Sequence, residues 1–311
     1  MNRIKNHLLL FLKGMAMGAA DIVPGVSGGS IALITGIYQT LLESINSINA
    51  SALKLVLKGK FAAFYSAVNG SFLLSLLLGI FTSIFSLSKL ITYLMEEHPI
   101  PLWSFFCGLI LISAFLILKD IQRWNLGVLL AVLAGIVIAY WVTELPPLSS
   151  PDSLLFTFLA GAIAICAMIL PGISGSFILL ILGKYQSVLT ALSEKDLLTL
   201  GIFAGGCIVG ILSFSRVISW LLKKFHSLTI GILSGFMLGS INKLWPWKIV
   251  KSYRMSSSGE EKPFLTENIS PMNYLDTLGE EPKLLLAIIA FVFGIILVLG
   301  IDRLASYLSK K

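Results

Sequence analysis

The chain has 311 residues, of which 56% are hydrophobic and 13% are charged. A soluble domain has roughly 25% charged residues, because it needs polar side chains to cover its surface. The composition therefore excludes an ordinary soluble enzyme, a nucleic-acid-binding module and a disordered chain. The net charge of +7 needs a separate explanation. The three cysteines lie inside apolar runs and the three histidines are widely spread, so we expect no metal and no cofactor.

Eight apolar segments follow one another along the chain, and six of them are long enough to cross a bilayer as single helices. A bilayer-crossing helix needs about 20 mostly apolar residues. The sequence therefore predicts an all-α, polytopic membrane protein that forms a single membrane domain over residues 1–311. The six predicted crossings are, in chain order, residues 71–95, 99–118, 126–143, 196–222, 228–245 and 284–305.

The other two apolar segments, residues 8–48 and 153–192, are interrupted by clusters of proline and glycine. The first break is Pro-Gly-Val-Ser-Gly-Gly at residues 24–29, and the second is Pro-Gly-Ile-Ser-Gly-Ser at residues 171–176. Such clusters stop helices, and irregular backbone at membrane depth is tolerated only against protein or a water-filled cavity. Each segment is therefore either one broken crossing or a re-entrant pair of half-helices.

The two broken segments begin two copies of an internal repeat. Three short matches occur in the same order in both copies, which indicates duplication. We place repeat 1 at residues 8–143 and repeat 2 at residues 153–308. The matches pair residues 24–28 with 171–175, 36–39 with 183–186, and 86–91 with 213–218, and Gly108 with Gly235.

Lysine and arginine residues indicate how the repeats cross the membrane, because short cytoplasmic loops collect them. Basic residues precede the first broken segment at residues 3–13 and follow it at residues 54–60, so this segment is expected to enter and return. Each repeat then crosses three times, which turns the second copy upside down. In the alternative, each repeat crosses four times, the copies are parallel, and residues 54–60 lie outside.

The sequence thus predicts two inverted repeats, each a re-entrant helical hairpin plus three transmembrane helices, with both termini cytoplasmic. The basic residues are then accounted for by the cytoplasmic face, and nucleic acid is not expected as a partner. The polar segment 246–283 is expected to be an extracytoplasmic loop or a short surface cap, and its mixed charge suggests solvation without chemistry. The sequence indicates no oligomeric state.

Inverted repeats with broken helices are typical of secondary transporters, whose binding site lies at the repeat interface near the bilayer midplane. The two breaks are expected to meet there, where backbone N–H groups and serine hydroxyls favour an anion such as phosphate. For one break alone, a plain turn with a helix-capping serine is the alternative. The predicted substrate-binding residues at the breaks are Ser27, Gly28, Gly29, Ser30, Ser174, Gly175 and Ser176.

Lys89 and Arg216 lie at equivalent repeat positions inside predicted crossings. A charge inside the bilayer costs at least ~2.5–3.5 kcal/mol, so each of the two either contributes to an anion pathway or extends to the interface. We include both among the predicted substrate-binding residues.

Asp21 precedes the first break and has no acidic equivalent in the second repeat. It is a candidate for proton coupling, or it caps the helix that follows the break. Lys184, expected at the outer surface, is a secondary candidate for binding an anionic headgroup. Tyr38 and Tyr185 occupy equivalent positions and are secondary candidates, or they belong to an aromatic belt.

Residues 18–30, Gly-Ala-Ala-Asp-Ile-Val-Pro-Gly-Val-Ser-Gly-Gly-Ser, are followed by Gly-Ile-Tyr at residues 36–38. This pattern resembles the signature of the bacterial membrane family named domain of unknown function 368, and the second break and the chain length also fit. The resemblance covers most of the chain except residues 246–283. It implies translocation of undecaprenyl phosphate, the lipid carrier of cell-envelope synthesis, across the bacterial cytoplasmic membrane for recycling.

Three other functions compete with a polyprenyl-phosphate flippase. A secondary transporter for a small soluble anion would use the same kind of site without a lateral opening to lipid. An intramembrane enzyme acting on a lipid phosphate would need a base beside a serine, and Asp21 is the only obvious one. A non-transporting scaffold would have no need of intramembrane charge. We therefore expect a transporter and not an enzyme, with a polyprenyl phosphate, the bilayer and possible coupling protons as its partners.

Overall fold

The computed structural model describes residues 2–23, 25–148, 150–151, 153–255 and 261–309. Pro24 of the first break lies outside the described residues. The helices and strands are α1 (Asn2–Ile22), α2 (Gly28–Ile34), α3 (Tyr38–Asn46), α4 (Ala50–Leu57), α5 (Phe61–Ala67), α6 (Gly70–Glu97), α7 (Pro99–Lys119), α8 (Leu126–Glu144), α9 (Leu154–Ile169), α10 (Gly175–Ile181), α11 (Tyr185–Ser193), α12 (Leu197–Lys224), α13 (His226–Leu244), β1 (Lys248–Met255), β2 (Glu261–Asn268), α14 (Pro271–Leu278) and α15 (Leu284–Ser309).

Six of the described helices, α6, α7, α8, α12, α13 and α15, are long and apolar enough to cross a membrane. They coincide with the six predicted crossings. Large apolar side chains such as Phe85, Phe115 and Leu285 are exposed on their surfaces. Such exposure is costly in water and is tolerated in lipid, whose acyl chains are as apolar as leucine. The chain is therefore a polytopic helical membrane protein.

One segment is not helical, so the expectation of an all-α chain is wrong there. Strands β1 and β2 form an antiparallel hairpin in which Lys248 pairs with Asn268, and α14 follows. Two indole N–H groups connect the chain segments on either side of the hairpin. Trp245 Nε1 donates to the carbonyl of Ile269 at 2.8 Å, and Trp247 Nε1 donates to the carbonyl of Pro282 at 2.9 Å. Of the two forms expected for residues 246–283, the folded cap is the one observed.

The first helices of the two halves pack in the same way. α1 lies against α6, and α9 lies against α12. Gly14 and Gly79 form the first contact and Gly161 and Gly206 the second, and a Cβ on any of them would collide with a carbonyl oxygen of the partner helix. Small residues allow this close approach of helix backbones. The two glycine pairs occupy equivalent positions of the predicted sequence repeat, so matched residues make matching helix contacts in the two halves.

The last helix of each half packs against the other half. α8 contacts α13, where Gly135 meets Gly235, and α15 contacts α7, where Gly294 and Gly108 face the backbone of the opposite helix. Gly108 and Gly235 are the matched pair of the sequence repeat. The last helix of each half is therefore interlocked with the other half.

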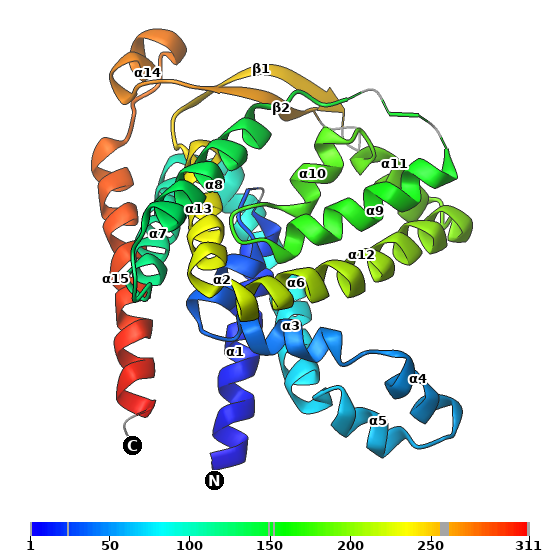
Figure 1. Cartoon of the computed structure of the whole chain (residues 1–311). Coiled ribbons are helices and arrows are strands. Elements are labelled where there is room, and N and C mark those ends of the chain that lie inside the picture. The colour runs from blue at the N-terminus through cyan, green and yellow to red at the C-terminus, as the bar shows by residue number, and fades with distance from the viewer. Residues whose placement is uncertain (1, 24, 149, 152, 256–260, 310–311) are drawn as a thin grey trace.

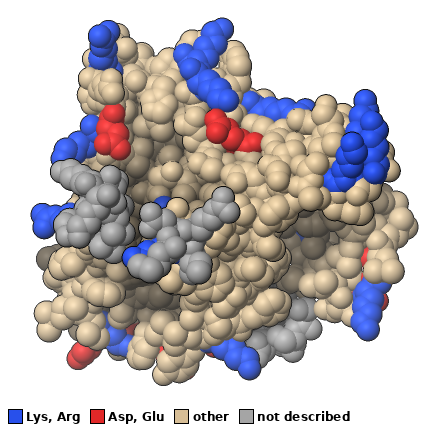
Figure 2. Space-filling model, turned by 90° about the horizontal axis from the view of Figure 1, so that it is seen from below, with Lys and Arg blue, Asp and Glu red and all other residues tan. Residues whose placement is uncertain are grey.

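The two ends of the molecule differ in the elements that they carry. α1 begins on the lower side in Figure 1, the chain returns to that side at α4 and α5, and α15 also ends there, whereas the β hairpin and α14 lie at the top. Figure 2 shows the lower side, where lysine and arginine side chains stand around the rim and acidic side chains are fewer among the residues described.

Candidate functional site

Each broken segment has two turns with the same backbone conformation. Gly25 and Gly172 have φ of 88° and 84° in the first turn, and Gly36 and Gly183 have φ of 71° and 66° in the second. These values lie in the left-handed region, which glycine adopts without steric cost. The turns separate helices of matching length: α2 and α10 have 7 residues each, and α3 and α11 have 9. Between α10 and α11 the chain bends by 106°.

The two breaks contact each other directly, as expected from the sequence. Ser27 Oγ accepts a hydrogen bond from Gly29 N at 3.1 Å and so caps α2. The same oxygen lies 3.1 and 3.2 Å from the carbonyl oxygens of Met168 and Leu170, to which it donates its proton. Ser30 Oγ accepts from Gly172 N at 2.9 Å. Ser27 and Ser30 thus form hydrogen bonds with the backbone at and just before the second break.

The second break has a different arrangement of hydroxyls. Ser174 Oγ lies 2.9 Å from Ser176 Oγ and makes no capping bond to α10. Ser174 and Gly175 are buried, and Ser176 is half-buried. Asp21 acts at the first break. Its Oδ1 accepts a hydrogen bond from Gly28 N at 2.7 Å, so Asp21 caps the helix that follows the break, which is one of its two predicted roles.

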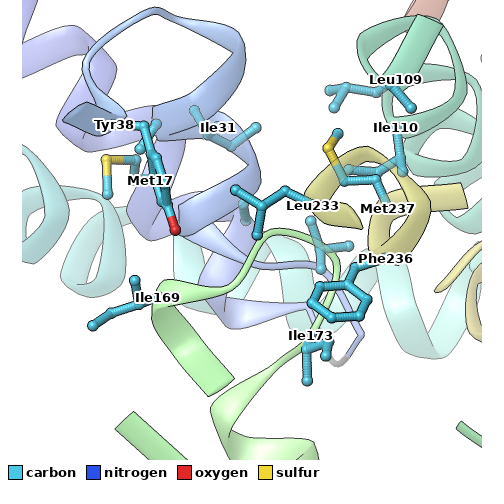
Figure 3. Close-up of a cluster of buried hydrophobic side chains, with 14 of the residues drawn as sticks. Met17, Ile31, Tyr38, Leu109, Ile110, Ile169, Ile173, Leu233, Phe236 and Met237 are labelled. Carbon is cyan, nitrogen blue, oxygen red and sulfur yellow. The ribbon is translucent and has the colours of Figure 1, made fainter. Parts of the chain in front are cut away.

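Tyr38 brings a further hydroxyl to the breaks. Its side chain is buried and points toward the second break, as Figure 3 shows, and its Oη has no hydrogen-bond partner among the described residues. A buried hydroxyl without a partner is costly, so it is a candidate donor to a ligand. Ile173 of the second break packs beside Phe236 of α13 in the same region.

Lys184, expected on the outer side of the membrane, has a side chain that is buried within the protein. It is 2% exposed, and its Nζ lies 5.9 Å from the centre of the Phe156 ring on α9. Tyr185, next in the chain, is half-buried. Lys184 lies in the turn that joins α10 to α11, and Tyr185 is the first residue of α11.

Lys89 and Arg216 lie away from the contact between the breaks. Both are exposed, on α6 and α12 respectively, and no hydrogen bond or ion pair of the described residues joins either one to a break. Arg216 lines an open groove of about 630 Å³ next to α3. The other lining residues are Asn46, Ser219, Trp220, Lys223 and Lys224.

A cavity of about 330 Å³ lies below the β hairpin and contains two lysines that the sequence analysis did not select, Lys243 and Lys248. Lys243 lies inside the predicted crossing 228–245, and Lys248 belongs to the segment to which no chemistry was assigned. The signal that could have selected them is that the two lysines flank Trp245 and Trp247 at the end of a predicted crossing. The cavity is lined by Tyr140, Thr143, Glu144, Leu145, Pro147, Phe177, Leu180, Asn242, Lys243, Lys248, Thr266, Glu267 and Asn268.

Comparisons with known proteins agree on one family. A polyprenyl-phosphate transporter of Vibrio cholerae is 50% identical over 302 residues, which cover 97% of this chain and 98% of the relative. A polyprenyl-phosphate transporter of Staphylococcus aureus is 35% identical over 257 residues, or 76% of this chain and 85% of the relative. No solved structure matches the chain.

The family model that matches residues 17–262 is the VCA0040-like model, described as undecaprenyl phosphate translocase-like. The match includes both breaks and most of the two repeats, and it agrees with the resemblance seen in the sequence. The relatives are named as transporters, as expected for a protein that is not an enzyme. The chain belongs to this VCA0040-like, undecaprenyl phosphate translocase-like family of membrane transporters.

Proposed function

We propose that this protein moves a polyprenyl phosphate, undecaprenyl phosphate, across the bacterial cytoplasmic membrane and so recycles the lipid carrier of cell-envelope synthesis. The observation that carries the proposal is the 50% identity, along nearly the full length, to a protein named as a polyprenyl-phosphate transporter. The direct contact between two symmetry-related breaks supports it, because broken helices at a repeat interface are where secondary transporters bind their substrates.

The proposed topology is two inverted repeats, residues 8–143 and 153–308, each with a re-entrant hairpin and three crossings. Three observations support it. The first broken segment begins and returns on one side of the molecule, both chain ends lie on that side, and basic side chains surround it. Cytoplasmic loops collect lysine and arginine, so we assign this side to the cytoplasm and residues 246–283 to the opposite side.

The phosphate headgroup is proposed to pass between the two breaks while the polyprenyl tail stays in lipid. The bonds from Ser27 to the end of α9 and from Gly172 to Ser30 close this passage. Each is a neutral hydrogen bond with a net contribution of about 0.5–1.5 kcal/mol, so a charged headgroup that accepts from the same donors can replace them. The Tyr38 hydroxyl, which has no partner among the described residues, is a further donor.

The proposal extends to the charged candidates. Arg216, in its groove with Lys223 and Lys224, is assigned to a headgroup path along α12, and Lys89 holds the equivalent place on α6. Asp21 is assigned to proton coupling, because its carboxylate reaches the first helix turn after the break and a proton there would weaken the bond to Gly28 N.

Reconstitution into liposomes separates the competing functions. The same proteoliposomes are assayed for movement of labelled undecaprenyl phosphate between leaflets, for uptake of inorganic phosphate, and for release of phosphate from the lipid. We expect leaflet exchange alone to exceed that of empty liposomes. Phosphate uptake without lipid exchange would indicate a transporter for a soluble anion, and phosphate release would indicate an enzyme.

A further inference from the structure

The cavity below the β hairpin is lined at one end by two cations that lie close together. Lys243 lies in the last turn of α13, and Lys248 begins β1 and donates from Nζ to the carbonyl of Lys243 at 2.6 Å. Lys248 Nζ lies 4.2 Å from the centre of the Trp103 ring, and Lys243 Nζ lies 4.6 Å from that of Phe177. Each ammonium group lies over an aromatic ring. Because a ring does not use all three N–H donors of an ammonium group, donors remain for a ligand.

The carboxylates in the cavity wall are bound elsewhere. Glu144 Oε1 accepts from Asn242 Nδ2 at 2.6 Å, and Glu267 Oε2 lies 2.7 Å from Lys251 Nζ in an ion pair. Among the described residues, no carboxylate forms an ion pair with Lys243 or Lys248. The nearby Glu144 carboxylate acts on Lys243 through its charge without forming an ion pair, so neither ammonium group has an ion-pair partner in the cavity, an arrangement that favours an anion.

The cavity adjoins both breaks. The stem of Lys243 lies against the first break, where a Cβ on Gly25 would come within 3.0 Å of Lys243 Cγ. Its ammonium lies over Phe177, which follows Ser174 on α10 by less than one helical turn. One side chain thus connects the cavity with the two segments that meet at the repeat interface. A group bound to Lys243 is next to the proposed passage.

We propose that this cavity is a second site for a phosphate group, at which Lys243 and Lys248 hold the headgroup of a phosphate monoester on the hairpin side of the passage. The inference rests on the proposed function for its lipid substrate. The cavity has room for a phosphate and the start of an isoprenoid chain, since small-molecule sites begin at about 300 Å³. The lining is mainly polar, which suits the headgroup, and Tyr140, Leu145 and Leu180 add apolar surface that the start of such a chain could contact.

Binding to the purified full-length protein in nanodiscs tests the site. The probes are farnesyl phosphate, inorganic phosphate and farnesol. We expect Lys243→Gln and Lys248→Gln each to weaken farnesyl phosphate binding by about tenfold or more, since each removes a charge-assisted hydrogen bond. Lys243→Arg and Lys248→Arg should restore much of the affinity. Lys195→Gln, at an exposed position between α11 and α12, is the matched control and should bind as the wild type does.

The outcomes separate this proposal from the proposed function. Farnesyl phosphate binding that is unchanged in both Gln variants would overturn the cavity site and leave the transport function standing. Binding of inorganic phosphate as tight as that of farnesyl phosphate, and equally dependent on the two lysines, would keep a phosphate site but reject the lipid as its ligand. Binding of farnesol as tight as that of farnesyl phosphate would also overturn the proposal. A variant counts only if its thermal unfolding matches that of the wild type.

Discussion

At the breaks, single serine hydroxyl groups form hydrogen bonds between the two halves of the protein. Ser30 is fully buried, and its Oγ is the acceptor for Gly172 N. We expect Ser30→Ala to lower the free energy of unfolding by about 1–3 kcal/mol, because the buried N–H would lose its partner. Thermal unfolding in detergent checks this. Ser86→Ala, which removes an exposed hydroxyl bonded within its own helix, is the control, and an equal effect of both would contradict the role of Ser30.

The charge on Lys248 predicts how headgroup binding depends on pH. Burial, together with the nearby positive charge of Lys243, lowers the pKa of Lys248 to about 7, and Cys107 opposes this shift. A phosphate monoester is a dianion above its second pKa of about 6, so it favours the charged form of Lys248. Affinity for farnesyl phosphate should therefore fall as the pH rises from 7 to 9.

Lys248→Arg isolates this effect, because an arginine stays charged over the whole range. Lys243 on α13, Glu144 on α8, Glu267 on β2 and Cys107 on α7 face the same region and are unchanged in the variant. We expect the variant to lose most of the fall in affinity between pH 7 and 9. The same fall in both proteins, measured by titration at each pH, would assign the dependence to another group.

At the scale of the elements, the packing of α9 on α12 depends on glycine. Gly206 faces the carbonyl oxygen of Phe158, whereas Gly201 on the same helix has open space around its Cβ position. Gly206→Leu should destabilise the protein by about 1–3 kcal/mol or prevent its accumulation, because the contact is with backbone and cannot be relieved by a rotamer change. Gly201→Leu should have little effect. Unfolding temperatures that are similar for the two variants would contradict this account of the helix contact.

The elements that the sequence predicted well depend on local patterns. The six crossings follow from hydropathy, and the break in each broken segment follows from its proline and glycine cluster. The second turns, at Gly36 and Gly183, were seen in the sequence only as a repeat match. The contact between the breaks followed from the repeat. The β hairpin escaped prediction because residues 246–283 lack a clear period-two pattern and are held by tryptophans that bond across a long sequence separation.

The candidate site was predicted only in part, because local patterns in the sequence do not show contacts between distant segments. The two breaks were expected to meet because they belong to a repeated motif, and Ser27 and Ser30 make the contacts. The environments of the lysines depend on tertiary packing: Lys184 is buried beside α9, Arg216 is exposed in a groove, and Lys243 and Lys248 meet only when the hairpin folds over α13. For these lysines and Arg216, the separation from a break along the sequence therefore did not indicate the separation in the folded protein.

At the scale of the whole molecule, the proposed inverted topology predicts which loops face the cytoplasm. We expect a cysteine at Lys58, between α4 and α5, and a cysteine at Met272 on α14 to be labelled from opposite sides of the membrane. The measurement uses an impermeant thiol reagent on whole cells, in a background without Cys107, Cys166 and Cys207. Labelling of both positions from the same side would contradict two inverted repeats with cytoplasmic termini.

The interlocked packing of the halves suggests how such a protein opens. The last helix of each repeat lies on the other half, so the halves stay joined while the breaks separate. The serine bonds between the breaks are neutral hydrogen bonds, whereas the glycine contacts between the helices involve closely packed backbone. If the headgroup passes between the breaks as proposed, we expect a local opening there and not a separation of the repeats.

The most direct test of polyprenyl-phosphate translocation follows the phosphate headgroup in proteoliposomes. Labelled undecaprenyl phosphate is placed in both leaflets, and a phosphatase added outside removes only the headgroups that reach the outer leaflet. The account predicts that the reaction stops at the outer-leaflet fraction in empty liposomes and proceeds nearly to completion with this protein. A reaction that stops at the same fraction in both would contradict it.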